Sequence, residues 1–236
     1  MNPLPFFYQE QVDAGQPVVT LDGDTSRHIT GVLRMKTGDA IHLTDGRGQL
    51  LTAEITDDNK KKCDVRITAS QLIAAPARKV TIGLSLLKNR NRFEWFLEKA
   101  TEIGISEIIP LLSERTERQH FRADRMKSVL VSALLQSQQV WLPVLQEPMA
   151  LDAVIRDLHQ QQKFIAHCTD TEKTSLATLA DKNAGSQVIL IGPEGDFTPQ
   201  EISAALQQGF MPVALGDTRL RTETAGVVAA ALLMNC

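Results

Sequence analysis

Cysteine is scarce in this chain of 236 residues: its three copies, Cys63, Cys168 and Cys236, are widely separated and form no C-x-x-C pair. This spacing excludes the usual zinc ligand patterns, and the scattered, odd-numbered set favours a reducing compartment. A long apolar run is absent too, because the longest, residues 225–234, is shorter than the roughly 17 residues that span a bilayer. The N-terminus also lacks the basic start and apolar core of a signal peptide. We therefore expect a cytoplasmic protein without a membrane segment.

Several familiar site motifs are missing as well. The sequence contains no G-x-x-x-x-G-K-[ST] phosphate loop, no G-x-S-x-G nucleophile elbow and no H-E-x-x-H metal pair, so we expect no metal cofactor. Positive charge is not in excess either, because 25 Lys and Arg against 28 Asp and Glu give a formal net charge of −3. A protein with this balance that binds RNA must gather its cations on one face.

The first third of the chain is predicted to be a small domain of short strands around one helix. Asp45-Gly46 is a hairpin signal between two strand-like runs. The helix is expected at about residues 25–34, with Asp24 or Thr25 as its N-cap. Such short elements predict a compact barrel. The predicted strands are residues 18–21, 40–43, 49–56 and 63–68.

After a small-residue boundary at residues 74–78, the pattern changes to alternating strands and helices. This alternation predicts an α/β domain with a mostly parallel sheet. Its strands are expected at residues 80–87, 105–111, 164–167, 188–191 and 212–215. Its helices are expected at residues 90–103, 123–138 and 151–161, then from Pro199, and through the apolar run 225–234. A helix that is apolar on every face must be buried all round.

Two loops near the C-terminus are the most informative part of the chain: residues 191–197, IGPEGDF, and residues 215–225, LGDTRLRTETA. Each follows an apolar run and opens onto a helical pattern, so both are expected at the carboxyl edge of the sheet, where α/β proteins bind ligands. Their glycines let the backbone approach a flat ligand. Glu194, Arg221 and Glu223 supply charge beside it.

Local structure explains part of both loops without any ligand. Thr198 or Asp196 can cap the helix that starts at Pro199, and Thr222 can cap the last helix with Glu223 in its first turn. Capping does not explain why Arg219 and Arg221 precede the positive end of that helix. An anionic or carbonyl-bearing ligand would resolve this conflict, so we favour a functional role for the segment.

Two basic clusters have two interpretations each. Residues 88–92, which include Lys88 and Arg92, form either a solvated face or a track for RNA phosphates. Arg27, His28 and Arg34 form the second cluster, on the predicted N-terminal helix, where His28 is either an ordinary surface histidine or part of an RNA contact. Residues 167–170, which end a strand, either line the ligand site or make a plain strand-to-helix turn.

The two loops resemble those of the RsmE family of 16S ribosomal RNA uridine N3-methyltransferases, which belong to the SPOUT superfamily. The first carries the family's GPEGG-type motif as Gly192-Pro193-Glu194-Gly195-Asp196, and the second carries its LG-x-x-x-LRTETA motif at residues 215–225. Further matches cover most of the chain. They are Arg27, His28, residues 32–34, Gly38 and Asp39, then Lys88, Arg92, Glu94, Lys99 and residues 102–104. Three residues depart from the family pattern: Asp196, Leu135 and Gln139.

The resemblance implies a C-terminal SPOUT domain, residues 79–236, with a trefoil-knotted and mostly parallel sheet. It implies an N-terminal PUA-like RNA-binding β-barrel, residues 1–73, and a homodimer that packs through the helix at residues 225–234. The implied reaction transfers a methyl group from S-adenosylmethionine to N3 of a uridine in 16S rRNA of the small ribosomal subunit. Two alternatives remain open: a SPOUT ribose 2′-O-methyltransferase acting on tRNA or rRNA, and an RNA-binding ribosome-assembly factor without catalysis.

The resemblance and the loop chemistry together assign three sets of residues. The expected catalytic residues are Arg221, Glu223 and Glu194, with either carboxylate as the proton acceptor. The expected RNA-binding residues are Arg27, His28, Arg34, Lys88 and Arg92. The expected cofactor-binding residues are Gly192, Pro193, Glu194, Gly195, Leu215, Gly216, Leu220, Arg221, Thr222 and Thr224.

Overall fold

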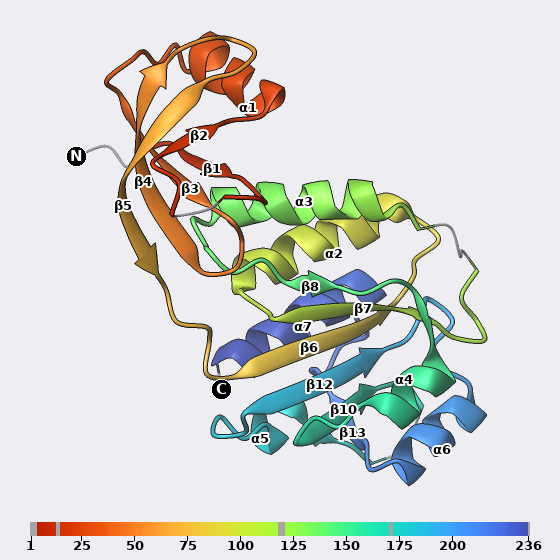
Figure 1. Cartoon of the computed structure of the whole chain (residues 1–236). Helices are drawn as coiled ribbons and strands as arrows, with labels where there is room; N and C mark the ends of the chain where they lie inside the picture. Colours follow the sequence, from red (N-terminus) through yellow and green to blue (C-terminus); the bar gives the residue numbers. More distant parts are fainter. Residues whose placement is uncertain (1–3, 13–14, 118–120, 170–171, 236) are drawn as a thin grey trace. The chain divides into compact units, whose positions relative to one another are not determined.

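The computed structural model describes residues 4–12, 15–117, 121–169 and 172–235 (Figure 1). The chain forms two compact units. The first comprises Met1–Ala75 together with Leu134–Leu142, and the second comprises Pro76–Ala133 and Pro143–Cys236.

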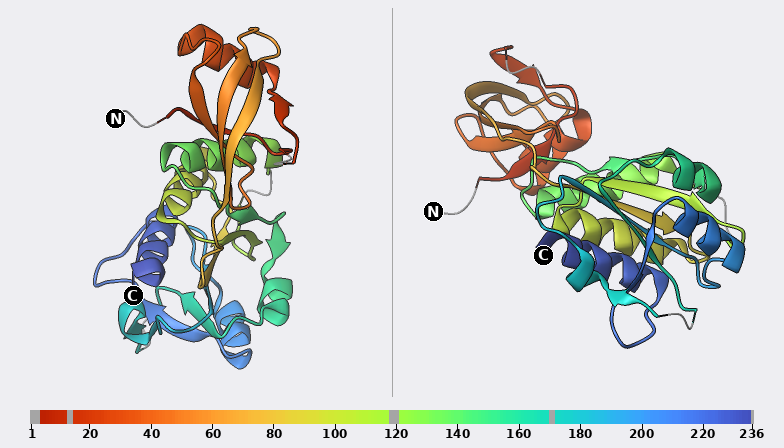
Figure 2. Two further views of the ribbon diagram at one scale, coloured as in Figure 1. Left: turned by 60° about the vertical axis from the view of Figure 1, so that its left-hand side comes forward. Right: turned by 90° about the horizontal axis from the view of Figure 1, so that it is seen from below.

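The first unit is built on a five-stranded sheet in the order β1-β3-β4-β5-β2. β1 pairs with β3 in parallel and the other pairs are antiparallel; the long strands β4 and β5 can be followed in Figure 2. Side chains alternate between buried and less buried along β3 and β4, as period-two patterning requires, and Ile41, Leu51 and Ile55 are fully inaccessible to solvent. The strands are β1 Phe6–Tyr8, β2 Val18–Thr20, β3 Ala40–Thr44, β4 Gln49–Asp57 and β5 Asp64–Leu72.

The helical segment of this unit begins earlier than predicted. Asp22 is the N-cap, because its Oδ1 accepts the backbone N–H groups of Asp24 and Thr25, each at 2.9 Å. The prediction of Asp24 or Thr25 as the cap is therefore wrong. The helix α1, Gly23–Arg27, continues as a π-helical turn, η1, His28–Val32.

Arg34 follows this segment with φ 58°, so the predicted helix cannot run through it.

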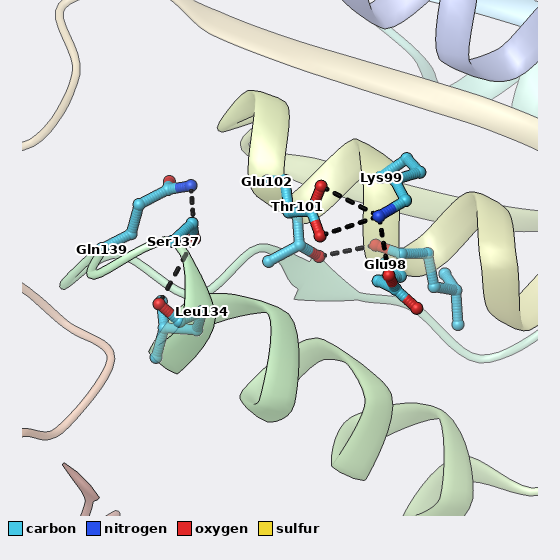
Figure 3. A network of polar contacts seen from close by, with 8 residues as sticks. Glu98, Lys99, Thr101, Glu102, Leu134, Ser137 and Gln139 are labelled. Carbon is cyan, nitrogen blue, oxygen red and sulfur yellow. Dashed lines mark hydrogen bonds and ion pairs between the residues drawn. The ribbon is translucent and has the colours of Figure 1, made fainter. Parts of the chain in front are cut away.

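A short segment from the second half of the chain completes the first unit. The indole of Trp141 lies so close to Gly48 that a Cβ there would come within 2.5 Å of the ring. Gly48 also donates its N–H to the Val140 carbonyl at 2.8 Å. Of the two family departures in this segment, Leu135 is half-buried and Gln139 donates its side-chain amide to the Ser137 hydroxyl at 3.0 Å (Figure 3).

The second unit has an eight-stranded sheet in the order β11-β13-β10-β12-β6-β7-β8, with β9 also paired to β7. Every pairing among its described strands is parallel, which confirms the predicted α/β class with a mostly parallel sheet. The strands are β6 Lys79–Ser85, β7 Glu107–Leu112, β8 Val144–Leu145, β9 Met149–Ala150, β10 Gln162–Ala166, β11 Thr174–Ser175, β12 Ser186–Ile191 and β13 Met211–Ala214. The helices are α2 Arg90–Ile103, α3 Ala123–Gln136, α4 Leu151–Asp157, α5 Leu176–Leu179, α6 Pro199–Gln207 and α7 Thr222–Asn235.

Helices cover both faces of this sheet. α4 and α6 pack beside each other on the face that carries Ile109, Leu111 and Val188. α7 lies along β6 with α2 next to it, as Figure 1 shows. Gly226 permits this close packing, because a Cβ there would meet Leu84 at 2.5 Å and the Phe96 ring at 2.7 Å.

Two helix predictions need correction. The helix expected at residues 151–161 ends at Asp157, because Leu158 already has an extended backbone with ψ 127°. The last helix is not buried all round: Ala229 and Leu233 are fully buried, whereas Val227, Val228 and Ala231 are half-buried. Among the described residues, no helix is both long enough and apolar enough to cross a membrane.

Candidate functional site

A cavity of about 710 Å³ lies in the second unit where three neighbouring strands end. The segments that follow β10, β12 and β13 form its walls, and the first turn of α7 closes one side. Because the three strands are parallel, their carboxyl ends share one edge, and both informative loops meet there.

The loop after β12 is held in a narrow conformation. A Cβ on Gly192 would lie 3.0 Å from the Phe197 backbone nitrogen, so a side chain fits poorly at this position. Asp196 donates its N–H to the Pro193 carbonyl at 2.9 Å, which closes a turn over Glu194 and Gly195. The loop is therefore a tight turn that presents its main chain and Glu194 to the cavity.

Two contacts anchor the C-terminal side of this turn. Thr198 and Glu201 form a capping box at the start of α6, so Thr198 is the cap among the two predicted candidates. Arg115, in the segment after β7, donates from Nη1 to the Gly195 carbonyl at 2.7 Å.

The turn at the end of β10 forms a second wall, through His167 and Cys168. The His167 ring is buried and its Nδ1 lies 2.7 Å from the Thr169 hydroxyl. Burial, and then the Lys173 ammonium, lower the pKa of His167, while Asp196 acts in the opposite direction. His167 is therefore a neutral side chain near pH 7. Asp170, the last residue of the predicted turn, lies outside the described residues.

The loop after β13 carries two of the cations that line the cavity, Arg219 and Arg221. Gly216 has φ 149°, and a Cβ there would meet no atom within 4 Å, so the backbone faces open space. Arg219 and Arg221 are exposed on the cavity wall. The Arg221 carbonyl accepts the Ala225 N–H at 2.7 Å, so Arg221 occupies the cap position of α7. Thr222 is the first helical residue, and its predicted role as the cap is wrong.

A buried carboxylate lies beside the cavity. Glu223 of α7 is 7% exposed, and its Oε1 is 3.6 Å from Nε of Arg92 on α2. Its other oxygen, Oε2, has no hydrogen-bond partner among the described residues. A buried carboxylate oxygen without a donor is costly, so this atom indicates a missing donor such as a ligand or water.

The cavity brings together most, but not all, of the predicted site residues. Gly192, Pro193, Glu194, Leu215, Gly216, Leu220, Arg221, Thr222 and Arg92 line it. Among the described residues, Gly195, Glu223 and Thr224 lie next to lining residues without forming the wall themselves. Lys88 lines a separate, shallow hollow of about 470 Å³ with residues 89–91. Arg27, His28 and Arg34 are exposed on the first unit.

Lys173 is a lining residue that the sequence did not indicate. It lies outside the two glycine loops and seven residues after the end of β10, so only its proximity in the sequence to residues 167–170 could have indicated it.

Lys99 and Glu102, which carry part of the family resemblance, form a network on the surface of α2. Figure 3 shows the Lys99 ammonium between Glu98, at 2.7 Å, and Glu102, at 3.0 Å, and the second pair, three residues apart, supports the helix. No group of three or more metal-ligating side chains occurs within the described ranges.

Comparison with known proteins identifies the family. The model of an RNA methyltransferase domain matches residues 74–234, and that of an RNA methyltransferase PUA domain matches residues 21–68. The ribosomal RNA small subunit methyltransferase E of a Synechocystis strain is 30% identical over 221 residues, covering 92% of this chain and 72% of the relative. The chain belongs to the ribosomal RNA small subunit methyltransferase E family. This confirms the family resemblance, including a PUA domain in the first unit.

Solved structures of RNA methyltransferases share the fold. A probable rRNA-methyltransferase from Porphyromonas gingivalis is 37% identical, with a TM-score of 0.89 over 96% of this chain and 95% of the other. A methyltransferase E from Neisseria gonorrhoeae bound to S-adenosylmethionine is 28% identical, with a TM-score of 0.86 over 97% and 95% of the two chains. The similarity thus extends over both units of this family member.

Proposed function

We propose that the cavity at the ends of β10, β12 and β13 binds S-adenosylmethionine, and that the chain methylates N3 of a uridine in 16S rRNA. Membership of the family makes the chain an S-adenosylmethionine-dependent rRNA methyltransferase; the uridine N3 atom is the finer proposal. The cavity is the observation that supports the proposed cofactor site. Its volume of about 710 Å³ is within the range of roughly 300–1,000 Å³ typical of small-molecule sites, and both family loops line it.

The residues present fit the cofactor. Gly192 keeps its loop narrow, and the open space beside Gly216 leaves main-chain groups free to bind adenosine. Glu194 supplies negative charge on the wall for a cationic sulfonium. The residues proposed to hold the cofactor are Gly192, Pro193, Glu194, Gly195, Leu215, Gly216, Leu220, Arg221, Thr222 and Thr224.

When bound, the cofactor supplies an electrophilic methyl group, whose bond to sulfur breaks as the bond to N3 forms. The chain must then orient the base and stabilise the charge that N3 deprotonation creates. Arg221 is exposed on the cavity wall, which supports a role in binding the oxygens of the deprotonated base. The N3 proton passes to a carboxylate and then to solvent.

The two candidate carboxylates differ in environment. Glu194 is exposed and lines the cavity, which supports it as the proton acceptor. Glu223 is buried against Arg92, which supports a role in positioning that guanidinium. Arg92 in turn lines the cavity, where it can bind the RNA that delivers the uridine.

Further RNA contacts are proposed on each unit separately. On the first unit, Arg27, His28 and Arg34 are exposed around α1 and η1, and we propose that they contact RNA phosphates, with Arg27 released from its ion pair with Asp24. On the second unit, Lys88 is exposed and pairs with Glu117 at 2.8 Å, a contact that an RNA phosphate can replace.

The proposal also includes the assembly of the protein. The proposed domains are residues 1–73 and 79–236, although the segment Leu134–Leu142 belongs to the first compact unit, and the second domain has the trefoil knot of SPOUT proteins. A homodimer would cover the half-buried Val227, Val228 and Ala231 of α7. The substrate is then 16S rRNA within the small subunit, in the cytoplasm.

Nucleoside mass spectrometry of 16S rRNA from cells with and without the gene tests the reaction. We expect loss of N3-methyluridine in the deletion strain and its return with the wild-type gene. Loss of a 2′-O-methyl nucleoside instead would establish the ribose methyltransferase. Methylation assays on purified small subunits and on protein-free 16S rRNA identify the form of the substrate.

A further inference from the structure

Two charged side chains bind one main-chain group from each of three consecutive residues, His167, Cys168 and Thr169, at the end of β10. The Lys173 ammonium donates to the carbonyls of His167 and Thr169, at 2.8 and 2.7 Å. The N–H of the intervening Cys168 donates to Oδ2 of Asp196 at 2.7 Å. These charge-assisted hydrogen bonds hold the turn from both sides, and such bonds are stronger than neutral ones.

Asp196 makes this contact from an unusual backbone conformation. Its φ is 62°, in the left-handed region that favours glycine. Its second oxygen, Oδ1, accepts the N–H of Phe197 at 2.8 Å, so a single carboxylate joins the loop after β12 to the turn after β10. A glycine would suit this backbone better but could make neither bond.

The turn that these side chains hold is a wall of the cavity. His167 and Cys168 line it, as do Asp196 and Lys173 themselves. We infer that Asp196 and Lys173 are positioning residues that fix the 167–169 turn in the place required for S-adenosylmethionine binding. Their effect on the cofactor passes through this turn. The inference rests on the proposed function of the cavity.

Substitution of Asp196 separates its hydrogen bonds from its backbone conformation. Asp196→Gly keeps the positive φ and removes both side-chain bonds, whereas Asp196→Asn keeps an amide oxygen for the Cys168 N–H. We expect Asp196→Gly to raise the Kd for S-adenosylmethionine about tenfold, as for loss of one charge-assisted hydrogen bond, and Asp196→Asn to recover most of it. Once the cofactor is saturating, kcat should remain within about threefold of wild type, because the reacting atoms keep their partners. Lys173→Met should weaken binding in the same direction.

Gln138→Gly is the matched control. Gln138 is an exposed residue with φ 55° in the first unit and outside the cavity lining, so its replacement makes the same kind of backbone change elsewhere. Its Kd should equal that of wild type. An Asp196→Gly variant with a wild-type Kd would overturn the inference.

Hydrogen exchange on the ligand-free protein tests independently whether Asp196 holds the turn. The Cys168 amide should exchange faster in Asp196→Gly than in wild type and Asp196→Asn, because its acceptor is lost. Unchanged exchange would show that Asp196 does not hold the turn. If wild type failed to bind S-adenosylmethionine, the proposed function would fail, while exchange would still decide whether this carboxylate holds the turn.

Discussion

Arg92 of α2 and Glu223 of α7 join two helices beside the cavity through an ion pair of 3.6 Å between Nε and Oε1. The pair is unequal, since 35% of the Arg92 side chain is exposed but just 9% of the Glu223 side chain. The carboxylate therefore depends on the arginine for charge compensation, whereas the arginine is also stabilised by water.

Arg92→Ala should destabilise the second unit because it leaves the Glu223 carboxylate buried without a counter-charge. We expect the free energy of unfolding in urea to fall by about 1–3 kcal/mol, as for other unsatisfied buried groups. Glu223→Gln in the same chain should restore part of the loss, since a neutral amide costs less to bury. Arg156→Ala breaks an exposed pair with Asp152 and should change stability by less than about 0.5 kcal/mol. Equal losses of unfolding free energy in Arg92→Ala and Arg156→Ala would contradict this account.

Arg221→Ala should reduce methylation without affecting the fold. Arg221 is exposed on the cavity wall, so its side chain contributes little to packing. If it stabilises the charge on the base, kcat should fall about 10²–10³-fold, the usual effect of removing one such donor. The melting temperature should stay unchanged, and Arg66→Ala, at an exposed pair with Glu54 in the first unit, should keep wild-type kcat. Wild-type turnover in Arg221→Ala would remove this residue from the chemistry.

The sequence predicted those elements whose signals are local. The helix α2 occupies the predicted residues because Asn89 caps its start and Gly104, with φ 91°, ends it. The two-residue strands β8, β9 and β11 carry too little pattern and form through pairing with β7 and β13. The cap of α1 was missed because Asp22, Asp24 and Thr25 are all suitable cap residues within four positions.

The site was predictable only where its residues carry a local sequence signal. Glycines and a family motif mark the loops after β12 and β13, and both loops line the cavity. The contacts of Asp196 with Cys168, and of Lys173 with His167, link segments that the sequence separates. Such contacts depend on how the strands order themselves in the sheet, which periodicity does not specify.

Gly226→Ala should destabilise the second unit through overpacking. A methyl group at this position would lie 2.5 Å from Leu84 and 2.7 Å from the Phe96 ring, so α7 must shift away from β6 and α2. We expect a loss of about 1–3 kcal/mol in urea unfolding. Gly185→Ala is the matched control, because its nearest neighbour beyond the adjacent residues would be the flexible Gln161 side chain at 3.6 Å. A loss of equal size in Gly185→Ala would show that glycine replacement itself, rather than the close packing of α7, is responsible.

Alkylation of the cysteines should distinguish the cavity from the core of the first unit. Cys168 is exposed on the cavity wall, whereas Cys63 is buried, and burial raises the pKa of its thiol from 9.0 to about 11. In a Cys236→Ser background at pH 8, iodoacetamide should therefore label Cys168 and spare Cys63. Saturating S-adenosylmethionine should slow labelling of Cys168 by covering it, as peptide mass spectrometry would measure.

Raising the pH should then reveal the ionisation of the Cys63 thiol. The folded chain holds this thiol proton more tightly than the unfolded chain, so its contribution to stability is complete below pH 9.0 and is lost as the pH rises toward 11. Labelling of Cys63 should begin in that interval, and Cys63→Ser should remove the corresponding part of the alkaline loss of stability. Rapid labelling of Cys63 at pH 8 in folded protein would contradict its burial, and labelling of Cys168 that S-adenosylmethionine does not slow would argue against cofactor binding at this wall.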